Sequence, residues 1–186
     1  MTVLDVSSYL GLGAVGAITL NLVLGALITL RYSPKRFWPH RQVNIFALHR
    51  WTAYIAVVLT VTHPIVLLFL RPPKFAVGNI TLPIHSYLQP RINTAGAAAV
   101  YLLLLVLGSS LLRVRIGRPI WRSLHYLVYP AAVLLVVHSI YTDPDLKTGH
   151  PNFLDGGKIF IYAAAMACGL ATAMRLRMHQ RGFRAG

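Results

Sequence analysis

The chain has 186 residues, of which 56% are hydrophobic and only 12% are charged, and its mean hydropathy is +0.60. In soluble domains roughly a quarter of the residues are charged, so this composition excludes an ordinary soluble domain and indicates a membrane protein. The formal net charge is +14, from 18 basic and 4 acidic residues. Because the basic residues lie between apolar runs, as they do beside membrane spans, we expect no nucleic-acid partner.

Five apolar runs are each long enough to cross a bilayer as a helix. In chain order they cover residues 6–30, 44–70, 94–112, 119–141 and 157–174. We therefore expect an all-α integral membrane protein in which residues 1–186 form one transmembrane domain, a bundle of five helices. Five spans of about 20 residues leave no room for an appended domain that binds a flavin or a nucleotide. Small residues in the first span are typical of close helix packing; they are Gly11, Gly13, Gly16 and Gly25.

The charged residues predict how the bundle is oriented in the membrane. Most basic residues lie in the loop after the first span, in the loop after the third span and in the tail. The acids all fall on the opposite side; they are Asp5, Asp143, Asp145 and Asp155. The positive-inside rule then places the N-terminus outside and the C-terminus in the cytoplasm. Trp38, Trp51 and Trp121 cluster near the expected cytoplasmic interface. Arg outnumbers Lys 14 to 4, which hints at a GC-rich bacterial genome and hence at a bacterial inner (plasma) membrane.

Four histidines lie inside two of the apolar runs, where an ionisable side chain is costly and indicates a function. His49 and His125 each follow the start of their span by five or six residues, and these two spans run in the same direction. We therefore expect both at one depth, near the cytoplasmic side. His63 and His138 come roughly 21 Å and 19.5 Å further along the helix axis, near the outer side. The sequence thus predicts two His–His pairs at two depths.

Two facing imidazoles suit a metal whose equatorial positions are already filled, as they are in heme b. Zinc would need four clustered ligands, and a proton relay would need acids, which no span interior contains. The alternative is a heme-free scaffold or transporter whose histidines bond between helices. A separation of 13 residues turns a side chain about 140° from its starting face, so His125 and His138 share one groove only where their span bends or tightens. Pro130 is a cause of such a distortion.

Two runs resemble a known family. HRWTAYIAVVLTVTH resembles the first heme-ligand helix of the ferric reductase-like transmembrane domain family, and WRSLHYLVYPAAVLLVVH resembles the second. This family includes the membrane parts of ferric reductases and NADPH oxidases and the heme-binding membrane subunit of the bacterial methionine sulfoxide reductase system. The resemblance implies two b hemes, one ligated by His49 and His125 and the other by His63 and His138. It also implies electron flow from a cytoplasmic donor to an acceptor outside.

The arginines next to the inner pair, Arg50 and Arg122, are candidates for binding the anionic propionates of the inner heme. Full-length ferric reductases and NADPH oxidases usually have six spans and continue into FAD and NADPH domains, whereas this chain offers five and ends at Gly186. We therefore expect a separate donor, either quinol or a protein that brings a flavin, and an extracytoplasmic acceptor protein or small molecule. The chain would be an electron-transfer component of an oxidoreductase. The alternative within redox chemistry is a terminal reductase of ferric chelates or oxygen at the outer heme.

Overall fold

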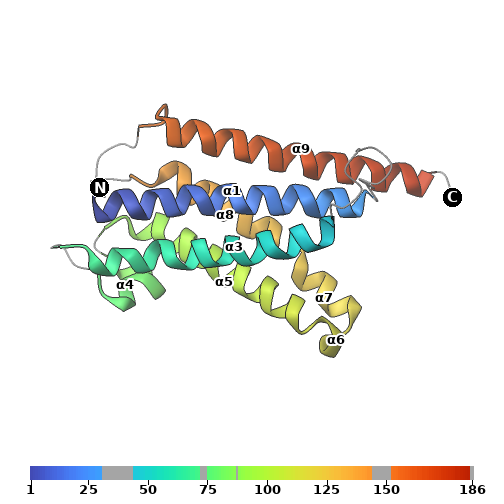
Figure 1. Ribbon diagram of the computed structural model, residues 1–186, viewed down its shortest axis with the longest axis horizontal. Coiled ribbons are helices and arrows are strands. Elements are labelled where there is room, and N and C mark those ends of the chain that lie inside the picture. The colour runs from blue at the N-terminus through green and yellow to red at the C-terminus, as the bar shows by residue number, and fades with distance from the viewer. Residues whose placement is uncertain (31–43, 72–74, 87, 144–151, 185–186) are drawn as a thin grey trace.

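The computed structural model describes residues 1–30, 44–71, 75–86, 88–143 and 152–184. In Figure 1 the long helices lie roughly along one axis, with the two termini at opposite ends. We call these the N-terminal end and the C-terminal end of the bundle. The long helices are α1 (Val3–Thr29), α3 (Ile45–Val66), α5 (Pro90–Leu111), α8 (Val128–Tyr141) and α9 (Gly156–Arg184). Shorter helices connect them; they are η1 (Leu67–Phe69), α4 (Val77–Thr81), η2 (Pro83–His85), α6 (Arg113–Ile116) and α7 (Arg118–His125).

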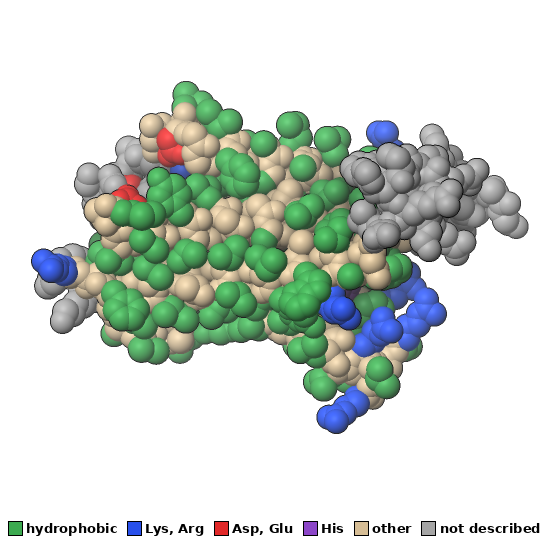
Figure 2. Space-filling model, viewed as in Figure 1, with side chains coloured by type: hydrophobic (Ala, Val, Ile, Leu, Met, Phe, Trp, Pro, Cys, Tyr) green, Lys and Arg blue, Asp and Glu red, His purple; other side chains and the backbone are tan. Residues whose placement is uncertain are grey.

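Five segments of the described chain are long and apolar enough to cross a membrane, which confirms the predicted number of spans. They are Val3–Thr29, Ile45–Phe69, Pro90–Leu111, Arg118–Tyr141 and Gly156–Met178, with mean hydropathies between 1.5 and 2.0. The protein is therefore an all-helical, multi-pass membrane protein over its described residues. Figure 2 shows hydrophobic side chains over the middle of the bundle and Lys and Arg side chains gathered mainly near α6 and α7. On α3, Trp51, Ile55 and Val58 repeat at helical spacing and are each more than half exposed, as expected of a lipid-facing stripe.

The helix ends follow local sequence signals. Thr2 and Asp5 form a capping box at the start of α1, and the Asn44 side chain accepts from the amide of Ala47 at the start of α3. Gly117 separates α6 from α7 with φ 79, a backbone conformation that favours glycine. Trp38 and the other predicted interface residues between positions 31 and 43 lie outside the described residues.

The fourth span is interrupted immediately after His125. α7 ends at His125 and α8 begins at Val128, and the intervening turn has 3₁₀-type bonds from the Leu127 amide to the Leu124 carbonyl and from the Tyr129 amide to the Tyr126 carbonyl. Pro130 explains the position of this break, because its ring clashes with the carbonyl four residues earlier and it has no amide hydrogen to donate there. The distortion expected from the 13-residue spacing is thus present.

The centre of the bundle is a closely packed aliphatic layer. It consists of Ile18, Ala56, Ala99, Leu103, Ala131 and Leu135, contributed by α1, α3, α5 and α8. Ala99 and Ala131 are completely buried, so the helices approach one another closely at this level. α9 packs on the outside of α1, where the Phe160 ring would lie 3.3 Å from a side-chain carbon at Gly16.

Candidate functional site

The four histidines form two pairs, and each pair joins α3 to the fourth span. The ring centres of His49 and His125 are 6.3 Å apart, and those of His63 and His138 are 6.2 Å apart. The two pairs thus have nearly the same separation, although His125 and His138 lie on two different helices. Ala56 is midway between the two histidines of α3, so the aliphatic central layer lies between the pairs.

The Nδ1 atom of three of these rings is bonded to a backbone carbonyl of a neighbouring helix. His49 Nδ1 lies 3.1 Å from the Asn21 carbonyl oxygen, His63 Nδ1 lies 2.7 Å from that of Ser7, and His138 Nδ1 lies 2.9 Å from that of Ile92. A carbonyl oxygen can only accept a hydrogen bond, so Nδ1 must carry the proton in all three rings. This leaves the lone pair on Nε2.

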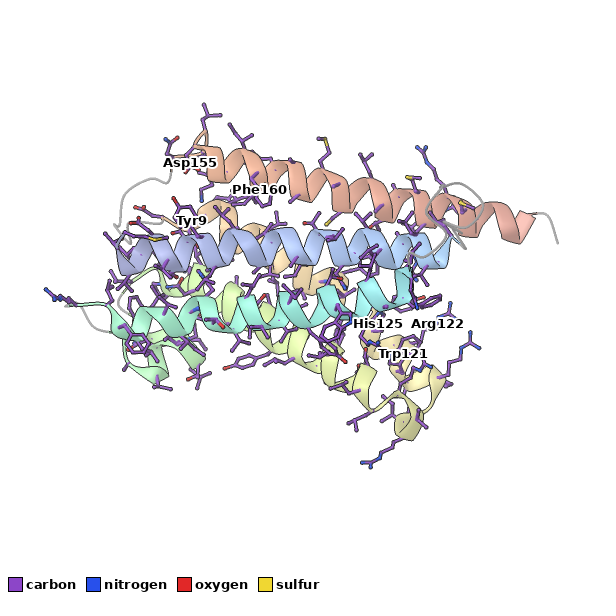
Figure 3. All side chains as sticks on the ribbon, viewed as in Figure 1. Tyr9, Trp121, Arg122, His125, Asp155 and Phe160 are labelled. Carbon is purple, nitrogen blue, oxygen red and sulfur yellow. The ribbon has the colours of Figure 1, made fainter. Side chains whose placement is uncertain are left out.

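His125 reaches the same tautomer through a serine. Its Nδ1 lies 3.4 Å from Ser110 Oγ, and the single hydroxyl hydrogen of Ser110 is donated to the Val106 carbonyl at 2.8 Å. Ser110 Oγ must therefore accept from His125, as it also accepts from Trp121 Nε1 at 3.3 Å. The Trp121 ring lies 5.2 Å from the His125 ring at a tilt of 32°. Figure 3 shows Trp121 and His125 together on α7.

The four Nε2 atoms are left without a hydrogen-bond partner among the described residues. No side-chain nitrogen or oxygen that is fully buried in the described part of the chain lacks a partner. The described residues therefore do not completely enclose any of the four Nε2 atoms. This is the arrangement of a histidine that ligates a metal through Nε2 while its Nδ1–H donates to a carbonyl, which fixes the ring orientation.

Glycines on the supporting helices make room for three of the rings. A side-chain carbon at Gly11 would lie 3.1 Å from the His63 ring, one at Gly25 would lie 3.3 Å from the His49 ring, and one at Gly96 would lie 2.8 Å from the His138 ring. Gly11 and Gly25 therefore serve the histidines as well as helix packing. The importance of Gly96 was missed by sequence reasoning, because nothing in the sequence indicates that it lies against His138.

The charged residues predicted for this site lie at the C-terminal end of the bundle. Arg50 and Arg122 are both exposed, and Arg122 Nε donates to the Tyr126 hydroxyl at 3.3 Å. Arg175 of α9 donates to the hydroxyls of both Tyr126 and Tyr129, and its guanidinium lies 5.3 Å from the centre of the Tyr126 ring. Arg175 thus ties α9 to the turn that follows His125, a contact that the sequence did not predict.

Comparison with known protein families identifies the family of this chain. The sequence model described as "Ferric reductase like transmembrane component" matches residues 12–136, which is more than half of the chain. The chain belongs to this family. The match includes His49, His63 and His125 and ends two residues before His138. Neither the curated proteins nor the solved structures gave a match.

Ferric reductase-like domains generally bind heme, and the residues present here suit that group. Because a metal–imidazole bond is about 2.0–2.1 Å long, two imidazoles that shared one metal would have ring centres about 6 Å apart. Both observed pairs have this separation. No cluster of three or more His, Cys, Asp or Glu side chains suited to a metal occurs among the described residues, whereas heme requires only two axial protein ligands.

Proposed function

We propose that this protein is a membrane cytochrome subunit that holds two b hemes and carries electrons across the bilayer within a multi-component oxidoreductase. The observation that supports this most strongly is the state of the four rings: each has a protonated Nδ1 bonded to a neighbouring helix and an Nε2 that has no partner among the described residues. His49 and His125 would hold one heme, and His63 and His138 the other. A heme b held between two imidazoles supplies one-electron iron chemistry.

The free nitrogens favour this proposal over a heme-free scaffold or transporter. Histidines that only linked helices would gain most by bonding through both ring nitrogens, because an unpaired polar atom inside a membrane bundle costs roughly 1–3 kcal/mol. Within the described part of the chain each ring bonds through one nitrogen, and in all four the other nitrogen, Nε2, has no partner. A shared pattern in four side chains on three helices is expected of ligands.

The charge distribution supports an orientation with the N-terminus outside. Among the described residues, Arg113, Arg115, Arg118 and Arg122 lie in α6 and α7 at the C-terminal end, whereas Asp143 and Asp155 lie at the N-terminal end. The positive-inside rule makes the C-terminal end cytoplasmic. His49 and His125 would then hold the inner heme, with Arg50 and Arg122 available for its propionates, and His63 and His138 the outer one. We assign the donor to a cytoplasmic protein or to quinol, and the acceptor to the extracytoplasmic side of a bacterial inner membrane.

Optical and electron paramagnetic resonance spectra of the purified protein test this proposal. The wild-type chain should contain two low-spin b hemes by pyridine hemochrome assay. His63→Ala and His138→Ala should each lose the same heme, while His49→Ala and His125→Ala should each lose the other. His85→Ala is the control, because His85 is exposed and belongs to neither pair. Protein without heme from heme-replete cells would overturn the proposal and favour the scaffold, and reduction of ferric chelates or oxygen by the chain alone would favour a terminal reductase.

A further inference from the structure

Lys158 is a buried lysine whose side chain closes the end of the helix that carries His138. Only 3% of its surface is exposed, although it lies in the first turn of α9. Its Nζ donates to the carbonyl oxygens of Ser139 at 2.6 Å, Ile140 at 2.8 Å and Thr142 at 2.8 Å. The last carbonyls of a helix have no hydrogen-bond donor within the helix, and Lys158 donates to three carbonyls at this end.

The three hydrogen bonds determine the charge of this group. A neutral amine has two N–H donors, whereas an ammonium has three, so three carbonyl acceptors require the ammonium. The His138 carbonyl, the next one towards the ring, accepts from the Thr142 amide and from the Thr142 hydroxyl instead. The positive charge is therefore held against the carbonyl of Ser139, the residue that follows His138.

We propose that the Lys158 ammonium sets the reduction potential of the outer heme by holding a positive charge at the end of α8. This inference depends on the proposed function, because it assumes a heme between His63 and His138. An electron added to that heme is stabilised by a nearby positive charge, and the interaction is strong because the surroundings are buried and apolar. The C-terminus of α8 alone would have the opposite effect, since it carries partial negative charge. Lys158 cancels that partial negative charge, so the outer heme accepts an electron more readily than it would without the lysine.

The position of Lys158 explains why it acts on one heme only. His125 and His138 are separated by the interrupted fourth span, and the aliphatic central layer lies between the pairs. α9 lies beyond the matched family region, so Lys158 is a link through which the fifth span acts on the heme-binding helices. Asp155 and Asp143 are the acids near Lys158, and Asp155 Oδ1 accepts from the Lys158 amide at 2.8 Å. Figure 3 labels Asp155 at the start of α9.

Redox titration of the full-length protein with optical detection tests the inference, with the His138→Ala spectrum used to assign the remaining inner heme. Lys158→Gln should lower the potential of the outer heme and leave the inner one unchanged, and Lys158→Arg should restore the wild-type value. Arg177→Gln is the control on the same helix, because Arg177 is exposed at the opposite end. An unchanged outer potential in Lys158→Gln, or equal shifts in both hemes, would overturn the inference.

A second variant covers the case in which Lys158→Gln does not assemble. Asp155→Asn removes the neighbouring negative charge and retains a side chain that caps helices well. It should raise the potential of the outer heme without changing that of the inner one, and no shift would overturn the inference. Wild-type protein that holds no heme would instead refute the proposed function, and Lys158 with it. Wild-type protein with two hemes and an unmoved outer potential in either variant would refute only the role of Lys158.

Discussion

Gly96→Ala should displace His138 and release the outer heme while the inner heme stays in place. Gly96 is buried in α5, and a side-chain carbon there would lie 2.8 Å from His138 Nδ1, 2.9 Å from Cε1 and 3.1 Å from Cγ. Non-bonded heavy atoms prefer about 3.5–4.0 Å, so the added methyl group is roughly 0.7 Å too close to the nearest ring atom. Because Nδ1 is also bonded to the Ile92 carbonyl, the ring can move away only by breaking that bond.

The cost follows from overpacking. Extra methyl groups in a tightly packed site cost about 1–3 kcal/mol, which is roughly a 5- to 150-fold weaker hold on the outer heme. Alanine is the better helix former by about 1 kcal/mol, so the substitution should not weaken α5 itself. Gly108→Ala is a matched control on the same helix, because no atom lies within 4 Å of a side-chain carbon at that position.

Heme content and reduced-minus-oxidised spectra of the two variants measure the effect. Gly96→Ala should retain about one heme per chain with the spectrum of the inner heme, and Gly108→Ala should retain two. The other glycines should follow the order of their distances, with Gly11→Ala, at 3.1 Å, more harmful than Gly25→Ala, at 3.3 Å. Full heme content and an unaltered spectrum in Gly96→Ala would refute the reasoning, since His138 would then not need the space left by glycine.

Three other substitutions test the supports of the inner pair. Asn21→Leu removes the side-chain donor to the His49 carbonyl and to Thr52 Oγ1. It should lower the free energy of unfolding by about 1–3 kcal/mol, measured by thermal unfolding, and weaken binding of the inner heme. Thr62→Val is the control, because it loses a bond only within its own helix and should change neither quantity. Pro130→Ala returns an amide hydrogen to the fourth span, which should then form a regular helix. His125 would turn relative to His138, so the electron paramagnetic resonance signal of the inner heme alone should change. An unaltered signal would contradict the role of Pro130. Arg175→Met removes the hydrogen bonds to the hydroxyls of Tyr126 and Tyr129 and should broaden the electron paramagnetic resonance signal of the inner heme. Arg177→Met should leave that signal unchanged. Equal effects of the two variants would show that the loss of positive charge matters and the hydrogen bonds do not.

The spans were predictable from the sequence because lipid requires long apolar runs, and the predicted run 44–70 agrees with the observed span Ile45–Phe69. The fifth helix extends further than its apolar run alone indicates. The predicted run ends at residue 174, before Arg175, whereas the span continues to Met178. The charge of Arg175 lowers the local hydropathy and therefore ends the predicted run. The helix itself continues, because the Arg175 side chain donates to the hydroxyls of Tyr126 and Tyr129 and the backbone hydrogen bonds are unaffected by the charge. The pairing of histidines at two depths was also predictable, because helical rise converts sequence separation into depth.

The supports of the histidines were not predictable, and the reason is physical. The acceptors of Nδ1 are the backbone carbonyls of Ser7, Asn21 and Ile92, and every residue has such a carbonyl. Which one meets a histidine depends on how far two helices slide along each other, and composition does not encode this. Lys158 was likewise unremarkable in the sequence, because a lysine at the edge of a span usually reaches water or headgroups. Only the packing of α9 against the end of α8 makes it a buried ammonium.

The four spans around the histidines have two regular roles, since two of them carry the rings and two support them. α3 is supported by α1, which offers Gly25 and the Asn21 carbonyl to His49, and Gly11 and the Ser7 carbonyl to His63. The fourth span is supported by α5, which offers Ser110 to His125, and Gly96 and the Ile92 carbonyl to His138. A glycine and a carbonyl about four residues apart lie on one face of a helix, so each combination presents a space and an acceptor to the same ring. The small residues of α1 are therefore part of the site, and substituting them should disturb heme binding before it disturbs the bundle.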